Sequence, residues 1–247
     1  MKIVATIEAR MRSSRLPGKV LRPLGGQPAL QRMIERIRLS RYVDEICIAT
    51  TTNRADDPII ELAENLDVNH FRGSEEDVLT RVLLAAHSVK ADLICELTGD
   101  CPLIDPYIID QCILSHLSGS YDYTSTFAHY ATYPIGFDTQ IFPVSVLQRV
   151  AAMTDDPIDH VHVSCFIYHN PKLFRINGIH AAPEQFGPDI RLTLDTPEDY
   201  KLIGKIFDAM DAAGQVWYAK DIVKHLKANP ELLKINRHVR KKTLDEG

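Results

Sequence analysis

Residues 2–19 read KIVATIEARMRSSRLPGK, a short apolar run followed at once by a polar and strongly basic stretch. The first part, Lys2–Ile7, is rich in β-branched residues and is typical of a buried strand. Pro17 and Gly18 mark the basic stretch as a loop. Within residues 29–37 the apolar side chains recur at the i, i+3, i+4 and i+7 spacing of an amphipathic helix. The chain therefore begins with a strand, a basic loop and a helix.

The same alternation continues after this opening. We expect two further strands, over Asp44–Thr50 and Asp92–Leu97. Two helices should lie between them, one from Asp57 to about Asn65 and one from Ser74 to about Val89, separated by a turn at residues 71–74. Such an alternation predicts an α/β fold with a mainly parallel sheet and crossover helices.

The second half of the chain departs from this rhythm. After a helix at about Pro106–Leu117, two strand-like segments flank a turn and predict a small antiparallel insertion at about residues 121–142. The remaining expected elements are helices near 144–152, 158–169 and 219–228, a strand over Arg191–Leu194, and a helix that begins around Asp195-Thr196-Pro197. With no repeat or linker, we expect one domain over residues 1–247 with a C-terminal helical tail at about 215–247.

The composition is that of an ordinary globular protein. The 247 residues are 45% hydrophobic and 25% charged. No stretch approaches the 18 or more apolar residues of a membrane span, and Glu8 and Arg10 interrupt the N-terminal run where a signal peptide would be apolar. The five cysteines form no CxxC pair. This usage favours a reducing compartment, so we expect a cytoplasmic protein without a membrane span.

The charge is unevenly distributed along the chain. The net charge is −5, but residues 1–41 hold ten Lys and Arg against Glu8 and Glu35, a local balance of +8 that leaves −13 for the remainder. A cationic segment on an acidic protein favours a local anion site, and no nucleic-acid partner is expected.

A cluster of cations follows the first strand directly. It consists of Arg10, Arg12, Arg15 and Lys19, with Ser13 and Ser14 between them. Ligands of open parallel sheets bind outside the carboxyl ends of the strands, and guanidinium, ammonium and backbone N–H groups there can hold several phosphates at once. The loop matches neither a Walker loop nor a dinucleotide fingerprint. A merely solvated loop is the alternative, which mutual repulsion of four cations disfavours.

Two aspartates come at the ends of two other expected strands. Asp100 follows the third strand, and Asp195 follows the late strand. Carboxylates combined with substrate phosphates are the ligands of Mg²⁺. Taken singly, Asp100 could be a turn residue, and Asp195 is better explained as a helix N-cap. Together with the basic loop, the two carboxylates predict a polyphosphate–Mg²⁺ site for phosphoryl-type transfer.

A histidine and cysteine cluster offers a competing constellation. It contains His160, His162, Cys165 and His169, of which the last three would share one face of a helix. Neither HExxH nor a CxxC partner accompanies it, so a structural role is favoured over a metal site.

Three segments of the chain resemble the cytidylyltransferase family that activates Kdo and sialic acids. These are IEARMRSSRLPGKVLRPLGGQP, ELTGDCPLID and LTLDTPEDY. RGSEEDVLTR, YPIGFDTQIF and NPELLKIN are similar to the spore-coat polysaccharide biosynthesis protein F-like branch of that family. The resemblance covers essentially the whole chain. It implies a Rossmann-like nucleotide-diphospho-sugar transferase fold and transfer of CMP from CTP to a sugar or phosphorylated acceptor, with release of pyrophosphate.

The resemblance also implies roles for individual residues. Arg10, Arg15 and Lys19 would hold the triphosphate and act in catalysis, with Ala9 and Ser14 beside them. Asp100 and Asp195 would bind Mg²⁺, and Asp100 would also face the nucleotide. The base pocket would contain Arg72, Ser74, Asp77 and Arg81. The acceptor would meet Tyr133, Gly136, Asp138, Gln140 and His160. A homodimer is a further expectation that rests on the resemblance alone.

The chain departs from the family pattern at several positions. Glu8 stands where many members of the family have an uncharged residue such as Gln, Glu96 stands where many have Arg, and Ile135 occupies a position often filled by Arg. Because Arg forks favour carboxylate recognition, these changes disfavour an anionic sugar as acceptor. Two alternatives to the enzyme remain: a non-catalytic nucleotide-binding protein, and a glycosyltransferase on a related fold. The latter usually holds its metal with a DxD pair, whose spacing Asp155-Asp156 lacks.

Overall fold

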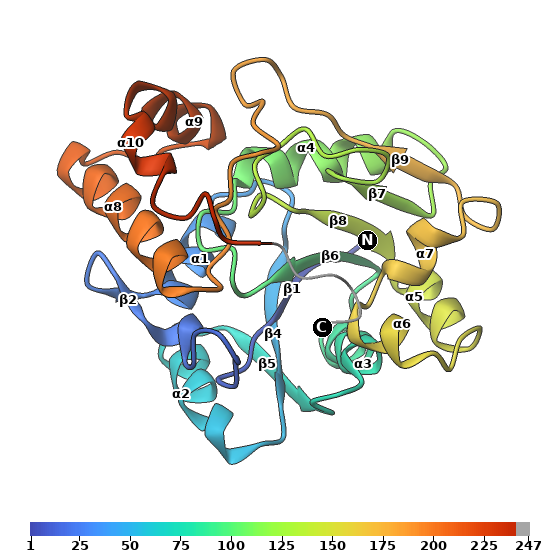
Figure 1. The fold of residues 1–247 in the computed structure, drawn as a ribbon. Coiled ribbons are helices and arrows are strands. Elements are labelled where there is room, and N and C mark those ends of the chain that lie inside the picture. Colours follow the sequence, from blue (N-terminus) through green and yellow to red (C-terminus); the bar gives the residue numbers. More distant parts are fainter. Residues whose placement is uncertain (241–247) are drawn as a thin grey trace.

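The central feature of the computed structural model, which describes residues 1–240, is a seven-stranded sheet with the order β5-β4-β1-β6-β8-β7-β9 (Figure 1). Four parallel neighbours make up one half: β5 (Asn69–Gly73), β4 (Glu45–Thr51), β1 (Ile3–Glu8) and β6 (Leu93–Thr98). In the other half β8 (Gln140–Pro143) is antiparallel to both of its neighbours, and β7 (Tyr123–Ser125) pairs in parallel with β9 (Ile176–Gly178). The expected α/β class, with a mainly parallel sheet and a small antiparallel part, is confirmed.

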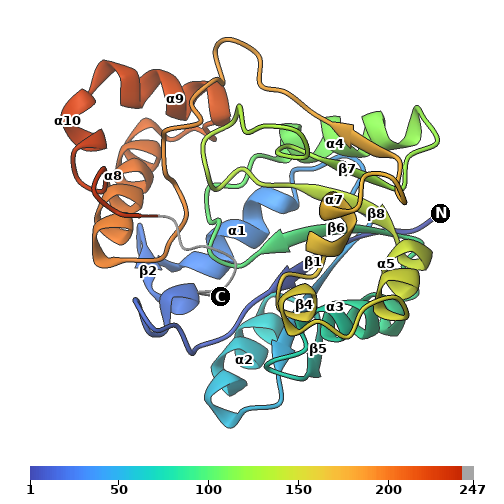
Figure 2. The ribbon, with the colours of Figure 1, turned by 45° about the vertical axis from the view of Figure 1, so that its right-hand side comes forward.

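Helices cover both faces of the sheet. Alternate side chains of β1 point to opposite faces, and apolar side chains on each face are buried against helices. Ile3, Ala5 and Ile7 pack with α1 (Ala29–Ile37), α2 (Asp57–Asn65) and α4 (Pro106–Leu117). Val4 packs on the other face with α3 (Val78–Ser88), α5 (Val144–Ala151) and α7 (Cys165–His169). Figure 2 shows the sheet between these two layers.

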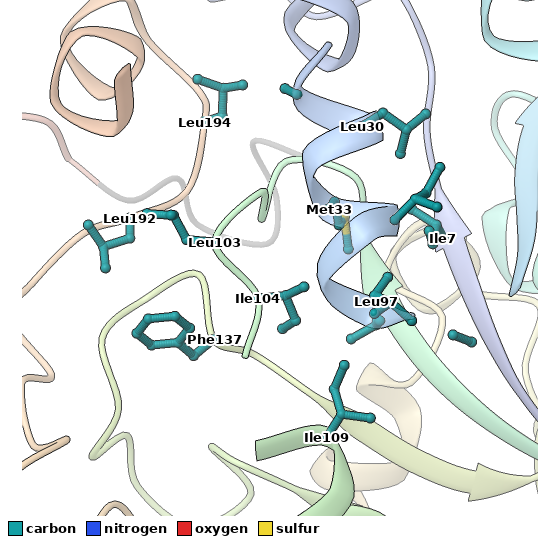
Figure 3. Packing of buried hydrophobic residues seen from close by; sticks show 14 of the residues in the cluster. Ile7, Leu30, Met33, Leu97, Leu103, Ile104, Ile109, Phe137, Leu192 and Leu194 are labelled. Atoms are coloured by element: carbon teal, nitrogen blue, oxygen red, sulfur yellow. The ribbon is translucent and has the colours of Figure 1, made fainter. Parts of the chain in front are cut away.

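The C-terminal helices extend the first layer. They are α8 (Pro197–Ala213), α9 (Ala219–Ala228) and α10 (Pro230–Leu233). Buried side chains of α8 and α9 join the cluster around Met33 and Leu30. Figure 3 shows how Leu103, Ile104, Phe137, Leu192 and Leu194 close this core around α1. The late segment that carries Asp195 is therefore anchored by apolar packing on both sides of its loop.

Local signals in the sequence begin and end several of these elements. Asp105 accepts hydrogen bonds from the first backbone N–H groups of α4, and Thr196 forms a capping box with Asp199 at the start of α8. Gly214 ends α8 in the left-handed conformation. A short hairpin of β2 (Pro23–Leu24) and β3 (Gln27–Pro28), which the sequence analysis did not anticipate, leads into α1.

Several expected boundaries are wrong. Residues 71–73, assigned to a turn, are the end of β5, and Asp77 rather than Ser74 caps α3. The expected helix at 158–169 is two short helices, α6 (Pro157–Val161) and α7, because Val163 adopts a φ of +48° between them. The expected strand over Arg191–Leu194 makes a single bridge from Arg191 to Ile135. Asp195 is not the N-cap of α8, since Thr196 is.

The tail expectation applies only in part. α9 and α10 lie within the expected tail, and its residues 241–247 lie outside the described residues. Within residues 1–240, no helix combines the length and the apolar character that crossing a membrane would take.

Candidate active site

A cavity of about 450 Å³ opens at the carboxyl ends of β1 and β6. Its wall contains most of the basic loop: Ala9, Arg10, Arg12, Ser13, Ser14, Arg15 and Lys19. Asp100 and Asp195 also line it. The backbone N–H of Leu194 donates to the carbonyl of Asp100 at 2.7 Å, which holds the two aspartates side by side although 95 residues separate them. The sheet edge thus assembles the three polar clusters that the sequence placed apart.

The basic loop is tied at both ends to the body of the protein. The backbone N–H of Met11 donates to Asp56 at 2.7 Å, and Leu16 is buried in the core. Gly18 has a φ of +68°, which favours glycine, and its N–H closes the loop by donating to the carbonyl of Met11 at 2.9 Å. The loop is therefore preformed, and its cations project from a fixed backbone.

The outer cations of the loop have weak partners. Arg10 and Arg12 are 43% and 66% exposed and approach Glu75 at 3.8 and 3.7 Å, distances too long for strong hydrogen bonds. Surface ion pairs of this kind contribute little to the stability of the folded protein. Both guanidinium groups therefore have donors available for an incoming anion.

Lys19 is the charge at the centre of the site. Its Nζ lies 2.7 Å from Oδ2 of Asp100 and 2.8 Å from Oδ1 of Asp195. Burial lowers the pKa of Lys19, but the two carboxylates outweigh burial and raise it above its ordinary value. Burial likewise acts against the charge of Asp195, yet Lys19, Arg15 and Arg191 bring the pKa of that carboxyl down to about 2. Asp195 is therefore an anion at neutral pH.

The two carboxylates fit a divalent cation. Carboxylate oxygens from the loop after β6 and from the segment before α8 converge on one positive group, the ammonium of Lys19. Mg²⁺ typically uses one or two carboxylates and completes its ligands with water and substrate phosphates. Within residues 1–240, no group of three or more His, Cys, Asp and Glu side chains is placed to hold a metal ion. The cluster of His160, His162, Cys165 and His169 is thus not placed to hold one either. Any metal at this edge would therefore need substrate oxygens beside Asp100 and Asp195.

The residues expected around the base divide into two groups. Arg81 lines the cavity with only 3% of its surface exposed, and its Nε has no hydrogen-bond partner. Arg72 instead points to the α2 side, where it binds Asp57 at 2.7 Å and two backbone carbonyls. Ser74 accepts backbone N–H groups of the turn before α3 and, like Asp77, is not part of the cavity wall.

His160 pairs with Asp77 rather than facing the cavity. Its Nδ1 lies 2.8 Å from the Asp77 carboxylate, and its Nε2 lies 3.0 Å from the carbonyl of Thr154. Both partners are acceptors, so the ring binds best when both nitrogens carry protons. These hydrogen bonds raise the pKa of His160 above its ordinary value. Its neighbours Val161 and His162 line the cavity in its place.

The other residues expected to bind the acceptor also lie outside the cavity wall. Tyr133 is buried and donates its hydroxyl to the carbonyl of His180 at 3.3 Å. Gly136 has a φ of +109° and lies so close to Leu192 that a Cβ would clash with its backbone. Asp138 accepts from the N–H of Gly136, and Gln140 is buried in β8 opposite Glu96. Their role toward an acceptor stays a prediction.

Two buried carboxyl groups lie near the floor of the cavity. Glu8 and Glu96 project from neighbouring strands on the face covered by α3, and each has one oxygen without a hydrogen-bond partner. Burial raises the pKa of Glu8 to about 8, against the attraction of Arg81. Burial and the nearby Glu8 also raise the pKa of Glu96 well above its ordinary value. Both carboxyl groups therefore hold their protons to a higher pH than an exposed glutamate does, although the sequence suggests two negative charges.

Three residues of the site escaped the sequence analysis. Arg191, Asp199 and Asn236 are buried behind Asp195 and contact it directly or through one another. The regular spacing of Arg191, Asp195 and Asp199 could have indicated that these side chains contact one another. The same spacing is equally typical of the charged start of a helix.

Comparison with known proteins identifies the family. The model of a cytidylyltransferase family matches residues 4–227. The chain belongs to the cytidylyltransferase family. It is 35% identical over its full length to an uncharacterized protein of Methanocaldococcus jannaschii, with 99% of that protein covered. It is also 35% identical to the spore coat polysaccharide biosynthesis protein SpsF of Bacillus subtilis, over 93% of this chain and 95% of the relative.

Two solved structures share the fold. A cytidylyltransferase from Leptospira borgpetersenii superposes with a TM-score of 0.88 at 30% identity and covers 98% of this chain and 99% of its own. A CMP-2-keto-3-deoxy-manno-octonic acid synthetase, solved as a complex with CTP, gives a TM-score of 0.62 over 86% of this chain and 100% of its own. At 20% identity that likeness speaks for the fold alone. Family membership makes the chain a nucleotidyltransferase and confirms the expected class of enzyme.

Proposed function

We propose that this cytidylyltransferase uses Mg²⁺ and transfers CMP from CTP to a sugar or sugar-like acceptor, with release of pyrophosphate, in the synthesis of a surface polysaccharide or glycoconjugate. The pathway is supported by the likeness to SpsF of Bacillus subtilis, and the nucleotide by the synthetase of like fold that was solved with CTP. The five buried, free cysteines among the described residues support a reducing cytoplasm as its location. A homodimer stays a prediction.

The observation that carries this proposal is the convergence of Asp100 and Asp195 on Lys19, beside a loop of under-partnered arginines. In the absence of substrate, the ammonium compensates two carboxylates that would otherwise repel each other. Asp100 and Asp195 would hold Mg²⁺, which when bound neutralises phosphate charge and orients the triphosphate. Lys19 would then be available to the phosphates, next to Arg10 and Arg15.

In the proposed reaction, an acceptor oxygen attacks the α-phosphorus of CTP and forms a new P–O bond. The bond from the α-phosphorus to its bridging oxygen breaks, and its electron pair leaves with pyrophosphate. Arg10, Arg15 and Lys19 stabilise the negative charge that develops on the leaving group. Arg81, with its unpaired Nε, lies where it can bind the nucleotide. No side chain is assigned as general base.

The acceptor is the least constrained part of the reaction. Glu96 and Ile135 offer no guanidinium fork, so an acceptor whose carboxylate needs Arg at these positions is disfavoured. Tyr133, Gly136, Asp138, Gln140 and His160 would have to meet the acceptor outside the described cavity wall.

The test is pyrophosphate release with Mg²⁺ and each of the four nucleoside triphosphates. The acceptor panel contains Kdo, sialic acids, sugar 1-phosphates and small phosphorylated alcohols. We expect release with CTP and one acceptor class, and a loss on the order of 100-fold or more in the variant Asp100→Asn. Asp208→Asn, which alters an exposed residue of α8, should leave the rate unchanged. Full turnover by Asp100→Asn would contradict its role, and a wild-type protein that binds none of the four nucleotides in calorimetry would overturn the proposal.

A further inference from the structure

A chain of buried polar contacts leads from Asp195 into the protein. Behind the carboxylate that faces Lys19, Nη2 of Arg191 donates to Oδ2 of Asp195 at 2.5 Å. Nε of the same guanidinium donates to Oδ1 of Asp199 at 3.1 Å. Arg191 is 8% exposed and Asp199 is fully buried, so this ion pair lies inside the protein and not at its surface. A single planar fork thus joins the cavity carboxylate to an interior one.

Asp199 also holds the backbone that carries Asp195. Its Oδ2 accepts the backbone N–H of Asp195 at 3.2 Å and that of Thr196 at 3.0 Å. Through one carboxylate, the first turn of α8 therefore controls both the main chain of Asp195 and, by way of Arg191, its side chain. The bond to Thr196 is the reciprocal half of the capping box, but the bonds of Asp199 to the N–H of Asp195 and to Arg191 go beyond what helix capping requires.

The last link comes from the segment that follows α10. Asn236 is 3% exposed, and its Nδ2 donates to Oδ1 of Asp199 at 2.8 Å and to the backbone carbonyl of Arg191 at 3.0 Å. A primary amide has two hydrogens on one nitrogen and can make both bonds at once. An aspartate here would place a second negative charge against Asp199. An apolar residue would remove the side-chain donor to the buried carbonyl of Arg191 and would leave Oδ1 of Asp199 with Arg191 as its remaining side-chain donor. The position therefore requires an amide for reasons beyond packing.

We propose that Asn236 is a positioning residue of the active site, which acts through Asp199 and Arg191 to orient the Asp195 carboxylate toward Lys19 and the divalent cation. The inference rests on the proposed function only in taking Asp195 as a metal ligand. It gives the NPELLKIN segment a role in the reaction, although that segment lies about forty residues after Asp195 and does not line the cavity. Groups behind a metal ligand typically change metal affinity or activity by about 10- to 100-fold when removed.

The test compares Asn236→Leu with Asn229→Leu. Asn229 lies in the same C-terminal part of the chain and bonds only to the end of α9 through its side chain, so its replacement is a matched control. The probe is Mn²⁺, titrated with the protein and CTP and followed by electron paramagnetic resonance. We expect Asn236→Leu to raise the Kd for Mn²⁺ by about tenfold or more, and to lower kcat more than it raises KM for CTP. Asn229→Leu should change neither.

Arg191→Lys provides a second route if Asn236→Leu folds poorly. Lysine keeps the charge but cannot bridge Asp195 and Asp199 with one rigid fork, so the same loss of Mn²⁺ affinity is expected. In the double variant the losses should not add, because both changes break one chain of contacts.

The outcomes separate the two proposals. Unchanged Mn²⁺ affinity in Asn236→Leu, or losses that simply add in the double variant, would overturn the positioning role while leaving the proposed function intact. A wild-type protein that binds no Mn²⁺ in the presence of CTP would overturn both.

Discussion

Replacing Glu8 by glutamine should remove a pH dependence of stability that the fold creates at the cavity floor. Burial raises the pKa of Glu8 from an ordinary 4.5 to about 8, because desolvation outweighs the attraction of Arg81. Between these two values the folded protein keeps a proton that the unfolded chain has released. The unfolding free energy must therefore fall as the pH rises from about 4.5 to about 8.

The size of the effect follows from the distance between the two pKa values. At about 1.4 kcal/mol for each pH unit, the full range corresponds to roughly 5 kcal/mol. Glu8 lines an open cavity, so water and local relaxation reduce the cost of ionisation, and we expect about 2 kcal/mol. Glutamine is neutral at every pH and has nearly the same shape. Glu8→Gln should match the wild type near pH 5 and exceed its stability by about 2 kcal/mol near pH 8.

Urea denaturation followed by circular dichroism at several pH values measures this difference directly. Glu61→Gln, which changes an exposed glutamate of α2, serves as the control and should run parallel to the wild type. If Glu8→Gln also ran parallel, or were less stable near pH 8, Glu8 would be an ionised partner of Arg81 and the argument from burial would be wrong.

Two further predictions concern His160 and the glycines. Asp77→Asn keeps the cap of α3 but removes the charge beside His160, so the pKa of that ring should fall in an NMR titration. The ion pair of the wild type is present below pH 6.5 and is lost as the pH rises through the raised pKa of His160. The difference in unfolding free energy between wild type and variant should therefore disappear in that range. An unchanged titration would contradict the pairing. Gly18→Ala should destabilise the protein by about 1 kcal/mol, because the φ of Gly18 is +68°. Gly204→Ala, in open space on α8, should instead stabilise it by up to about 1 kcal/mol. Urea denaturation measures both effects, and equal effects would refute the assignment of strain to Gly18.

Local sequence signals predicted the framework of the fold well. Lys2–Ile7 became β1 within one residue, and Pro106–Leu117 is α4 with the expected bounds. Apolar periodicity and caps act over a few residues, so they can be recognised without knowledge of the neighbours. The break at Val163 could not be recognised in this way. A positive φ at a β-branched residue is unfavourable by itself and persists only because the surroundings enforce it.

The composition of the cavity was predicted better than its geometry. Ala9, Arg10, Ser14, Arg15 and Lys19 line it as expected, because they follow one strand on one loop. Arg72 lies elsewhere, since each of its three guanidinium nitrogens donates a hydrogen bond on the α2 side of β5. Residue type indicates which group can bind a phosphate, but hydrogen bonds to distant segments decide where that group points.

The sequence alone determined that the basic loop follows β1 and that Asp100 follows β6, because strand, loop and helix signals are local. Only the tertiary structure decided that Asp100 and Asp195 share one ammonium, that burial raises the pKa values of Glu8 and Glu96, and that Asn236 donates to Asp199 and Arg191 behind Asp195. Each of these depends on which segments the sheet and α8 bring together. Distances and desolvation are properties of those encounters between remote residues, and no single stretch of the chain encodes them.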